Sequence, residues 1–271
     1  MTIGILSAES KLANKLINTL ATQDALEIIA ITDEVKDDAK KLEAAFTDID
    51  TLAFIPDYDQ LDAKLVQHMA VIDAAKKAGV KKVVYVSMIG EENKTAIAPV
   101  VAIHRKTEEL LAQSGLAYVI LRSGLYIGAE LDYIPEYRKI AKIENCAGTG
   151  LCSYTSRTEV AEALLHTITK SDFDGQTLNV AGEGITQTQL ADFINDVYGL
   201  DLAFENISVE KYSHLRAEAL GEKFGRLLAG IHESIKVGDF NVTSDFEKIT
   251  GHPHKNVLQL ITEYKYENSE H

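Results

Sequence analysis

The chain is poor in cysteine, proline and basic residues. Its 271 residues include two cysteines and four prolines, and 27 Lys and Arg stand against 41 Asp and Glu, for a net charge of −14. Cys146 and Cys152 have neither metal-site spacing nor a disulfide pattern, so we expect two reduced, buried thiols. The few prolines and the absence of low-complexity tracts argue against a flexible linker. Direct nucleic-acid binding needs a basic surface, so this composition disfavours it.

Long apolar runs are also missing. No stretch reaches the length that spans a bilayer, and the N-terminal apolar run is short, with no basic segment before it. We therefore expect a cytoplasmic protein with no signal peptide and no membrane association. The length and the 46% hydrophobic content suit one sizeable globular domain, alone or with a small lobe.

The first half of the chain alternates short apolar segments with helical patterns. Strands are expected at residues 2–6, 26–31, 51–55, 83–87 and 117–121, and helices at 12–20, 36–46 and 61–78, with a further helix carrying His104. Strands that are continuous apolar runs and alternate with helices form a parallel sheet covered on both faces. The sequence thus predicts an α/β fold with a Rossmann-like, doubly wound parallel sheet.

The rhythm loosens after Tyr126. Residues 127–145 are expected to be mostly helical, and Thr158 to cap a helix that runs to Thr169. A strand at 176–180 and an extended piece at 202–207 are expected, with helices at 188–198, 209–235, 244–249 and 257–264. We expect residues 1–126 to form the core, with its last strands contributed from within 150–182. Residues 127–271 then form a small, mainly helical substrate or cap lobe, interleaved with the core.

The stretch from Lys81 to Tyr126 is the candidate site. Ser87 and Arg122 end two strands, and one helix carrying His104 and Glu108 lies between them. Ligands of open α/β sheets bind beyond the carboxyl ends of the strands. Ser87 could hold a carbonyl oxygen or cap the next loop. His104 could lend a proton near neutral pH or pair with Glu108, and Arg122 is expected to bridge strand and lobe through a carboxylate rather than hold a ligand.

Several short motifs occur in a characteristic order along the chain. They are Val71-Ile72-Asp73-Ala74-Ala75, His104-x-x-x-Glu108 before Ser114-Gly115, Leu121-Arg122-Ser123-Gly124, Ser156-Arg157-Thr158-Glu159 and Thr243-Ser244-Asp245-Phe246. Over nearly its whole length the chain resembles atypical short-chain dehydrogenase/reductases of the NmrA-like group, especially the bacterial NAD(P)H:quinone oxidoreductase type. The resemblance implies NAD(P)H on the sheet and a small molecule under the C-terminal lobe. Some members reduce quinones, whereas others sense the cofactor and regulate partner proteins.

The phosphate loop departs from the pattern of the family. Ser7, Ser10 and Ala13 stand where the family has the glycines of Gly-x-x-Gly-x-x-Gly. Glu9 brings a carboxylate to the helix N-terminus, where it competes with a phosphate. A plain strand-to-helix turn and a surviving phosphate site both remain open. The resemblance assigns cofactor contacts to Ser7, Ala8, Glu9, Ser10, Thr32, Asp33, Ile55 and Pro56.

A second departure follows the second strand. Residues 34–50 suffice for one helix, where the family has two helices with a strand between them, so one strand-helix unit is expected to be missing. The position where NADPH-binding relatives often place an arginine holds Thr32, followed by Asp33 and Glu34. An acid there favours a free ribose hydroxyl and hence NADH over NADPH. The two acids equally suit a helix start or a solvated face.

The Tyr-x-x-x-Lys pair of classical members is absent, and Val100 and His104 occupy its positions. The resemblance leaves Ser87 and His104 as candidate catalytic residues. Met88 and Tyr126 are candidate substrate contacts, since Tyr126 could stack on a ring or fill the junction with the lobe. No metal site is expected, because His252-Pro-His254 has no carboxylate or cysteine cluster identifiable around it and reads as solvent-exposed.

Two functions remain open at this point. The first is an NAD(P)H-dependent oxidoreductase that reduces a quinone or a similar small carbonyl compound, with weakened cofactor binding. The second is a non-catalytic relative that has lost NAD(P) binding and acts as a small-molecule sensor or partner-binding regulator. Both place a small ligand in the cleft between core and lobe. The sequence leaves open whether the protein is a homodimer or a monomer.

Overall fold

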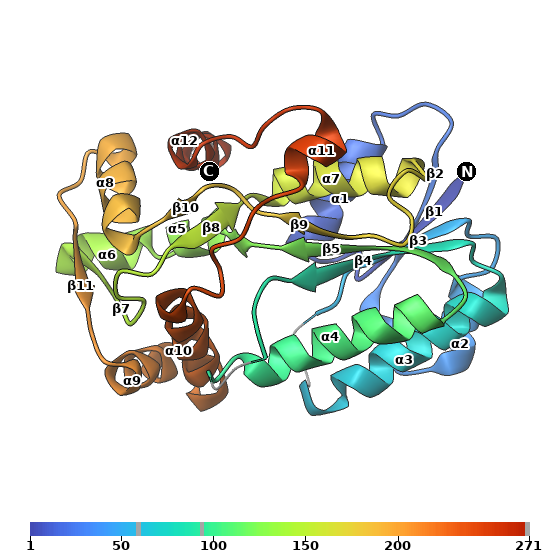
Figure 1. Cartoon of the computed structure of the whole chain (residues 1–271), viewed down its shortest axis with the longest axis horizontal. Helices are drawn as coiled ribbons and strands as arrows, with labels where there is room; N and C mark the ends of the chain where they lie inside the picture. The colour runs from blue at the N-terminus through green and yellow to red at the C-terminus, as the bar shows by residue number, and fades with distance from the viewer. Residues whose placement is uncertain (58–60, 93–94, 269–271) are drawn as a thin grey trace.

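The core of the molecule is a parallel β-sheet. The computed structural model describes residues 1–57, 61–92 and 95–268 (Figure 1). In this part of the chain the main sheet has six strands in the order β2-β1-β3-β4-β5-β9, and every pairing is parallel. The strands are β1 (Thr2–Leu6), β2 (Glu27–Ile31), β3 (Thr51–Phe54), β4 (Lys82–Met88), β5 (Ala117–Ser123) and β9 (Thr177–Val180). The predicted α/β, Rossmann-like fold is confirmed.

Helices cover both faces of this sheet (Figure 1). α1 (Lys11–Leu20) and α7 (Arg157–Thr169) lie on one face, and α2 (Ala39–Ala45), α3 (Leu61–Ala78) and α4 (Ala98–Gln113) on the other. Each face has its own cluster of buried apolar side chains. β3 and β4 are buried along their whole length, which explains their continuous apolar sequences.

The sheet ends at β2 on one side. After β2 the chain passes through a 3₁₀ turn, η1 (Asp33–Val35), and α2 directly to β3, which lies beyond β1. The described residues contain no strand outside β2, as expected for a missing strand-helix unit. The helix predicted over residues 36–46 starts later than expected. Asp38 caps it by accepting hydrogen bonds from the Lys40 and Lys41 amides, so α2 begins at Ala39.

The C-terminal lobe contains two small sheets as well as helices. One sheet has the order β10-β8-β6 and the other pairs β11 with β7. Its elements are β6 (Leu125–Tyr126), α5 (Ile127–Leu131), α6 (Ile134–Ile140), β7 (Lys142–Asn145), β8 (Cys152–Thr155), β10 (Gly184–Ile185), α8 (Gln187–Tyr198), β11 (Ala203–Asn206), α9 (Val209–Leu220), α10 (Glu222–Val237) and α12 (Val257–Glu267). α11 (Phe246–Thr250) packs on α7 instead. Of the segment 150–182, β9 joins the main sheet and β8 the small one.

The segment 127–145 is mostly helical, as expected; its helices end at Ile140, Ala141 adopts a left-handed conformation with φ of 54°, and β7 follows. The expected cap of α7 was wrong, because Ser156, not Thr158, caps this helix. The Ser156 side chain accepts from the Glu159 amide at 3.1 Å, and Glu159 accepts from the Ser156 amide at 3.1 Å. A capping box needs its acid three residues after the cap, and only Ser156 has that spacing to Glu159.

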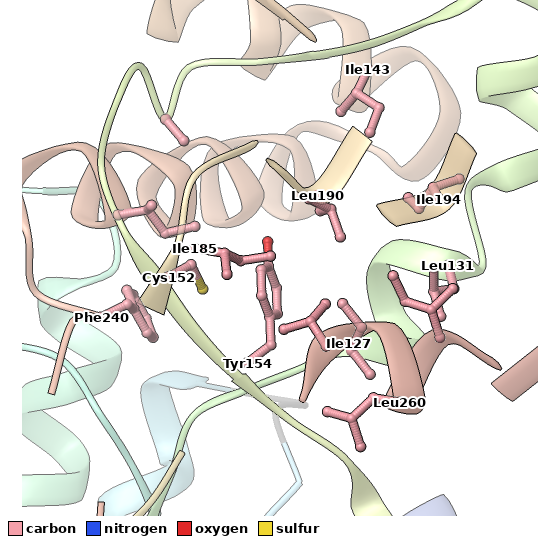
Figure 2. Packing of buried hydrophobic residues seen from close by; sticks show 14 of the residues in the cluster. Ile127, Leu131, Ile143, Cys152, Tyr154, Ile185, Leu190, Ile194, Phe240 and Leu260 are labelled. Carbon is pink, nitrogen blue, oxygen red and sulfur yellow. The ribbon is translucent and has the colours of Figure 1, made fainter. Parts of the chain in front are cut away.

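Tyr154 lies at the centre of the lobe's buried cluster (Figure 2). Apolar side chains from α5, α8, β10 and α12 surround its ring, among them Ile127, Leu190, Ile185 and Leu260. Its hydroxyl accepts a hydrogen bond from Gln187 Nε2 at 2.9 Å, and Gln187 Oε1 accepts one from Asn145 at 2.9 Å. This buried chain of polar groups joins α8 to both small sheets.

Both cysteines are free and buried, as expected. Burial raises the pKa of Cys146 to about 11 and that of Cys152 well above its usual range, so both thiols stay protonated at neutral pH. No helix in the described ranges combines the length and apolarity required to cross a bilayer.

We predict that Tyr154→Phe destabilises the protein by about 1–3 kcal/mol, because the Gln187 amide loses its buried acceptor. Urea unfolding followed by circular dichroism measures this change. Tyr266→Phe, at a position 71% exposed, serves as the control and should stay within about 0.5 kcal/mol of the parent. Equal stability of the two variants would contradict a structural role of the Tyr154 hydroxyl.

Candidate functional site

A cavity of about 260 Å³ lies between the core and the lobe. Its floor is the carboxyl end of β4 and of β5, and its roof comes from α5 and α10. The walls are mostly apolar. The lining residues are Val86, Ser87, Met88, Ile97, Val100, Ser123, Gly124, Leu125, Tyr126, Ala129, Glu130, Leu227, Leu228, Ile231 and His232. This is the position where open α/β sheets bind their ligands.

Glu108 connects the strand ends below the cavity. Its carboxylate accepts hydrogen bonds from Ser87 Oγ at 2.6 Å, from Arg105 Nη1 at 2.7 Å and from Arg122 Nε at 3.0 Å. Arg105 also donates to the Gly90 carbonyl at 2.6 Å. Ser87 and Arg122 are neighbours in register on β4 and β5, so one carboxylate on α4 holds two adjacent strands.

The network determines what Ser87 and Arg122 can do. Burial alone would raise the pKa of Glu108, but the hydrogen bonds from Arg122 and Ser87 hold it below its ordinary value. The carboxylate is therefore ionised at neutral pH. Ser87 has donated its hydrogen to it, so in this arrangement Ser87 presents lone pairs to a ligand and no hydrogen for a carbonyl oxygen. Arg122 binds a carboxylate, as expected, but that of Glu108 on the core helix α4, so the expected bridge between strand and lobe was wrong.

His104 lies away from the cavity. Its Nδ1 is 2.7 Å from the Tyr85 hydroxyl, and its ring is 2% exposed among Tyr85, His68 and α4. The expected pairing with Glu108 was wrong, since Glu108 is taken by Ser87 and the two arginines. Burial lowers the pKa of His104 to about 3, so at physiological pH the side chain is a neutral imidazole and not an imidazolium that could lend a proton.

Met88 and Tyr126 both line the cavity, so the structure places these two candidate substrate contacts beside Ser87. The Arg157 guanidinium covers the Tyr126 ring at 4.8 Å from its centroid. One face of that ring is therefore occupied by a cation at the start of α7.

Glu130 and His232 are polar lining residues that the sequence did not single out. Glu130 lies on α5 and His232 on α10, and Glu130 Oε1 is 3.5 Å from His232 Nε2. The one available signal was an acid within the apolar run Ile127-Gly128-Ala129-Glu130-Leu131. No spacing rule connects two residues so far apart in the chain.

The phosphate loop keeps the turn of a glycine loop with other side chains. Ser7 adopts a left-handed conformation with φ of 59°, which glycine enters without strain. Its Oγ donates to Asp33 Oδ1 at 2.7 Å. Ser10 caps α1 by accepting from the Ala13 amide at 3.2 Å, and the buried Ala8 donates its amide to the Ile31 carbonyl at 3.1 Å. Glu9 is exposed beside them.

The cleft beyond β1, β2 and β3 is closed by charged side chains. Asp57 binds Lys36 at 2.9 Å and also binds the buried Lys64. Ile55 is buried, Pro56 is half-buried and Thr32 is exposed. The space left among Ser7, Asp33, Pro56 and their neighbours is about 20 Å³, enough for a water molecule. In this arrangement the space is too small for a dinucleotide, so these side chains would have to move for one to bind.

The expectation of two solvent-exposed histidines in the His252-Pro-His254 motif was wrong for His254. His254 Nδ1 lies 3.0 Å from Glu159 Oε1, and its ring stacks on Phe246 with centroids 4.1 Å apart. His252, which is half exposed, pairs with Glu162 at 2.8 Å. Each histidine thus has a carboxylate partner, and together they fasten the C-terminal segment to α7. Among the described residues, no group of three or more metal-ligand side chains comes together.

The parallel sheet, the loop position and the cavity beyond β4 and β5 define a Rossmann-type ligand-binding protein. Residues 11–171 match the family model described as NAD(P)H-binding, and the chain belongs to this family. The match begins after the loop residues Ser7 to Ser10. It confirms the NmrA-like, atypical short-chain dehydrogenase/reductase resemblance together with the relatives below.

The chain is similar in sequence to two named relatives and in fold to a solved structure. The chain is 27% identical to quinone oxidoreductase 2 of Escherichia coli over 91% of this chain and 87% of that protein. It is 30% identical to the NmrA-like family domain-containing oxidoreductase flvB of Aspergillus flavus over 63% of this chain and 57% of that protein. An NADPH complex of an NADPH-dependent quinone oxidoreductase from Escherichia coli superposes with a TM-score of 0.87, at 24% identity, covering 96% of this chain and 99% of that chain.

We predict that Glu108→Gln destabilises the protein by about 3 kcal/mol, because it leaves Arg105 and Arg122 without their shared buried carboxylate. The pKa of Glu108 is lowered in the folded state, so its stabilisation is complete at neutral pH and is lost as the pH falls through that folded value. Guanidinium unfolding at several pH values should therefore show that the difference in free energy of unfolding between parent and variant becomes smaller in acid.

The matched control for this prediction is Glu109→Gln. Glu109 is the next residue on α4, its side chain is 57% exposed and it pairs with Lys106 on the surface. We expect a change within about 0.5 kcal/mol and no acid-dependent narrowing. Similar losses in the two variants would show that Glu108 does not hold the strand ends together.

Proposed function

We propose that this protein is an NAD(P)H-dependent oxidoreductase that reduces a quinone or a similar small carbonyl compound, with weakened cofactor binding. The observation that carries the proposal is the apolar cavity at the carboxyl ends of β4 and β5 beneath the lobe. Family membership and the named quinone oxidoreductase relative support the same reaction class. The cavity volume of about 260 Å³ suits a small ring compound, since pockets for drug-sized ligands are generally larger.

Weak cofactor binding follows from the closed cleft. A dinucleotide must separate Lys36 and Lys64 from Asp57 and displace the hydrogen bond of Ser7 to Asp33 before it can enter. The carboxylate of Glu9 at the start of α1 opposes a phosphate there. Each of these contacts subtracts from the affinity that the family scaffold would otherwise provide.

NADH is the preferred cofactor under this proposal. Asp33 stands at the end of β2, where its carboxylate repels a 2′-phosphate and can accept from a free ribose hydroxyl once Ser7 has released it. No arginine follows β2 to meet such a phosphate, since the segment reads Thr32-Asp33-Glu34-Val35-Lys36.

The closed cleft favours a second function. A protein that has lost dinucleotide binding and senses a small molecule would retain the open cavity and seal the unused cleft with ion pairs, as Lys36, Asp57 and Lys64 do here. Such a sensor would bind its ligand without any cofactor and pass the signal to a partner protein. Under either function the small ligand occupies the cavity between core and lobe.

We predict that calorimetric titration detects binding of NADH. Its affinity should be lower than is usual for the fold and higher than the affinity for NADPH. The combined variant Ser7→Gly, Glu9→Gly and Ser10→Gly should bind NADH about tenfold tighter, equivalent to about 1.4 kcal/mol. It relaxes the strained turn at Ser7 and removes the competing carboxylate. Ser208→Gly, which alters a helix cap on α9, is the control and should change nothing.

If neither NADH nor NADPH gives a heat of binding with the parent or with the glycine variant, the reductase proposal fails and the sensor remains as the function. The variant also separates two causes of weak binding. Tighter binding assigns the weakness to the loop, whereas unchanged binding assigns it to the ion pairs of Asp57 and to the shortened region after β2.

We predict that the protein reduces 1,4-naphthoquinone with NADH as the electron donor. The loss of NADH absorbance measures this reaction. Ala129→Phe, which places a ring at the cavity wall, should lower kcat/KM about tenfold or more by filling the space that the substrate needs. Ala203→Phe, at an exposed position on β11, is the matched control and should leave kcat/KM unchanged. Equal effects of the two changes would mean that turnover takes place outside the cavity.

A further inference from the structure

The serine hydroxyls of the cavity have already donated their hydrogens. Ser87 Oγ donates to Glu108, and Ser123 Oγ donates to the Gly124 carbonyl at 2.9 Å. The Tyr126 hydroxyl interacts with Ser123. A hydroxyl that has given its hydrogen to a protein acceptor offers only lone pairs to a ligand. The two serine hydroxyls of the floor therefore offer acceptors and no donor to a ligand, although Arg105 Nη1 already lies 3.5 Å from Ser87 Oγ.

The roof adds a carboxylate. Glu130 is the acid among the described lining residues, and its side chain is 12% exposed. Its Oε2 accepts a hydrogen bond from the Tyr137 hydroxyl at 3.3 Å. Burial alone would raise the pKa of Glu130, but His232 and Tyr137 hold it below its ordinary value, so it is ionised at neutral pH. An ionised carboxylate accepts hydrogen bonds and donates none.

His232 stands against Glu130 without completing a hydrogen bond. Its Nδ1 is 2.9 Å from the Leu228 carbonyl, so Nδ1 carries a hydrogen. Its Nε2 lies 3.5 Å from Glu130 Oε1 and makes no hydrogen bond with any residue that the structure describes. The ring is 2% exposed and packs edge-on against Tyr212 at 4.8 Å. A buried polar atom without a partner beside a carboxylate marks an incomplete polar site.

Arg216, a cation on α9, does not complete the site either. Its two Nη atoms bind Glu136 with hydrogen bonds of 2.9 and 2.6 Å, and its buried Nε has no hydrogen-bond partner among the described residues. Its charge contributes to the low pKa of Glu130, but it donates no hydrogen bond to that carboxylate. Glu130 Oε1 thus lines an apolar cavity with only the long 3.5 Å contact to His232 Nε2, and no described side chain makes a close hydrogen bond to it.

We propose that the cavity binds an apolar ring compound that carries a hydroxyl group, and that the Glu130 carboxylate accepts the hydrogen bond of that hydroxyl. The place of the ligand is taken from the proposed function, whereas the hydroxyl is inferred from the polar groups of the walls. A ligand whose polar atom is a bare ether or carbonyl oxygen turns a lone pair towards Glu130 and binds more weakly. The quinone of the proposed function therefore binds more weakly than the hydroxyl compound that its reduction yields.

The expected discrimination is large. A site built to hydrogen-bond a hydroxyl rejects the analogue that lacks it, because the buried group is then left without a partner. With a charged acceptor the preference should be tenfold to a hundredfold in affinity, by the usual strength of charge-assisted hydrogen bonds. This preference does not depend on NAD(P)H or on turnover.

The test is calorimetric titration of the whole protein, without cofactor, with 2-naphthol and with 2-methoxynaphthalene. The two probes share one ring system and differ in a hydroxyl hydrogen. We expect 2-naphthol to bind at least tenfold tighter. In Glu130→Gln the ratio of the two affinities should fall several-fold. The control is Glu233→Gln, which changes a residue next to His232 in the chain that does not line the cavity. There the ratio should stay at the parent value.

Glu130→Met is the second variant, because its side chain has a similar length and carries no acceptor oxygen; its folding is first checked by circular dichroism. There the ratio should approach one. Equal binding of the two probes by the parent protein, no binding of either, or an unchanged ratio in the folded Glu130 variants would overturn the proposal. Loss of quinone turnover with the naphthol preference intact would instead count against the reductase and not against the hydroxyl site.

Discussion

The carboxylate of Glu108 is the contact on which the arrangement of this site depends. It receives Ser87 from β4, Arg122 from β5 and Arg105 from its own helix, so that one buried charge holds the carboxyl ends of two central strands. Two guanidinium groups and one hydroxyl compensate its desolvation. Arg105 extends the network to the carbonyls of Met88 and Gly90, which fixes the backbone that leads out of β4. The cavity floor is therefore an ordered surface.

The sequence predicted the elements that repeat a simple pattern and missed those that depend on distant partners. Thr2–Leu6 and Leu61–Ala78 have the predicted bounds, because buried parallel strands and long helices carry their own periodicity. β7 and β8 were missed, since strands of four residues in small sheets are specified by the partners β11 and β6 and not by local apolar runs. Ser87 was found because it ends a strand. Glu130 and His232 were not, because only the folded chain brings α5 and α10 to the same cavity.

The phosphate loop shows which property of a glycine motif has been kept. Ser7 holds the left-handed turn although it carries a side chain, and the strain is offset by its hydrogen bond to Asp33. Ser10 supplies an internal cap to the helix N-terminus that elsewhere receives phosphate. The backbone path of the family is thus retained while its anion-binding groups are partly satisfied from within. A family model that matches from Lys11 onward is consistent with a scaffold preserved beyond this loop.

The cleft and the cavity lie along one edge of the same sheet, yet they are controlled by different charges. Asp57 with its two lysines closes the space over β1 to β3, whereas Glu108 with its two arginines shapes the floor over β4 and β5. Since the Glu108 network takes up the Ser87 hydrogen, structural stability and ligand preference are set by the same contact. A carbonyl ligand accepts no hydrogen bond from the serines of this floor, so a quinone would bind more weakly there than the hydroxyl compound that its reduction yields. The selectivity of the cavity would then be a consequence of how the strand ends are held.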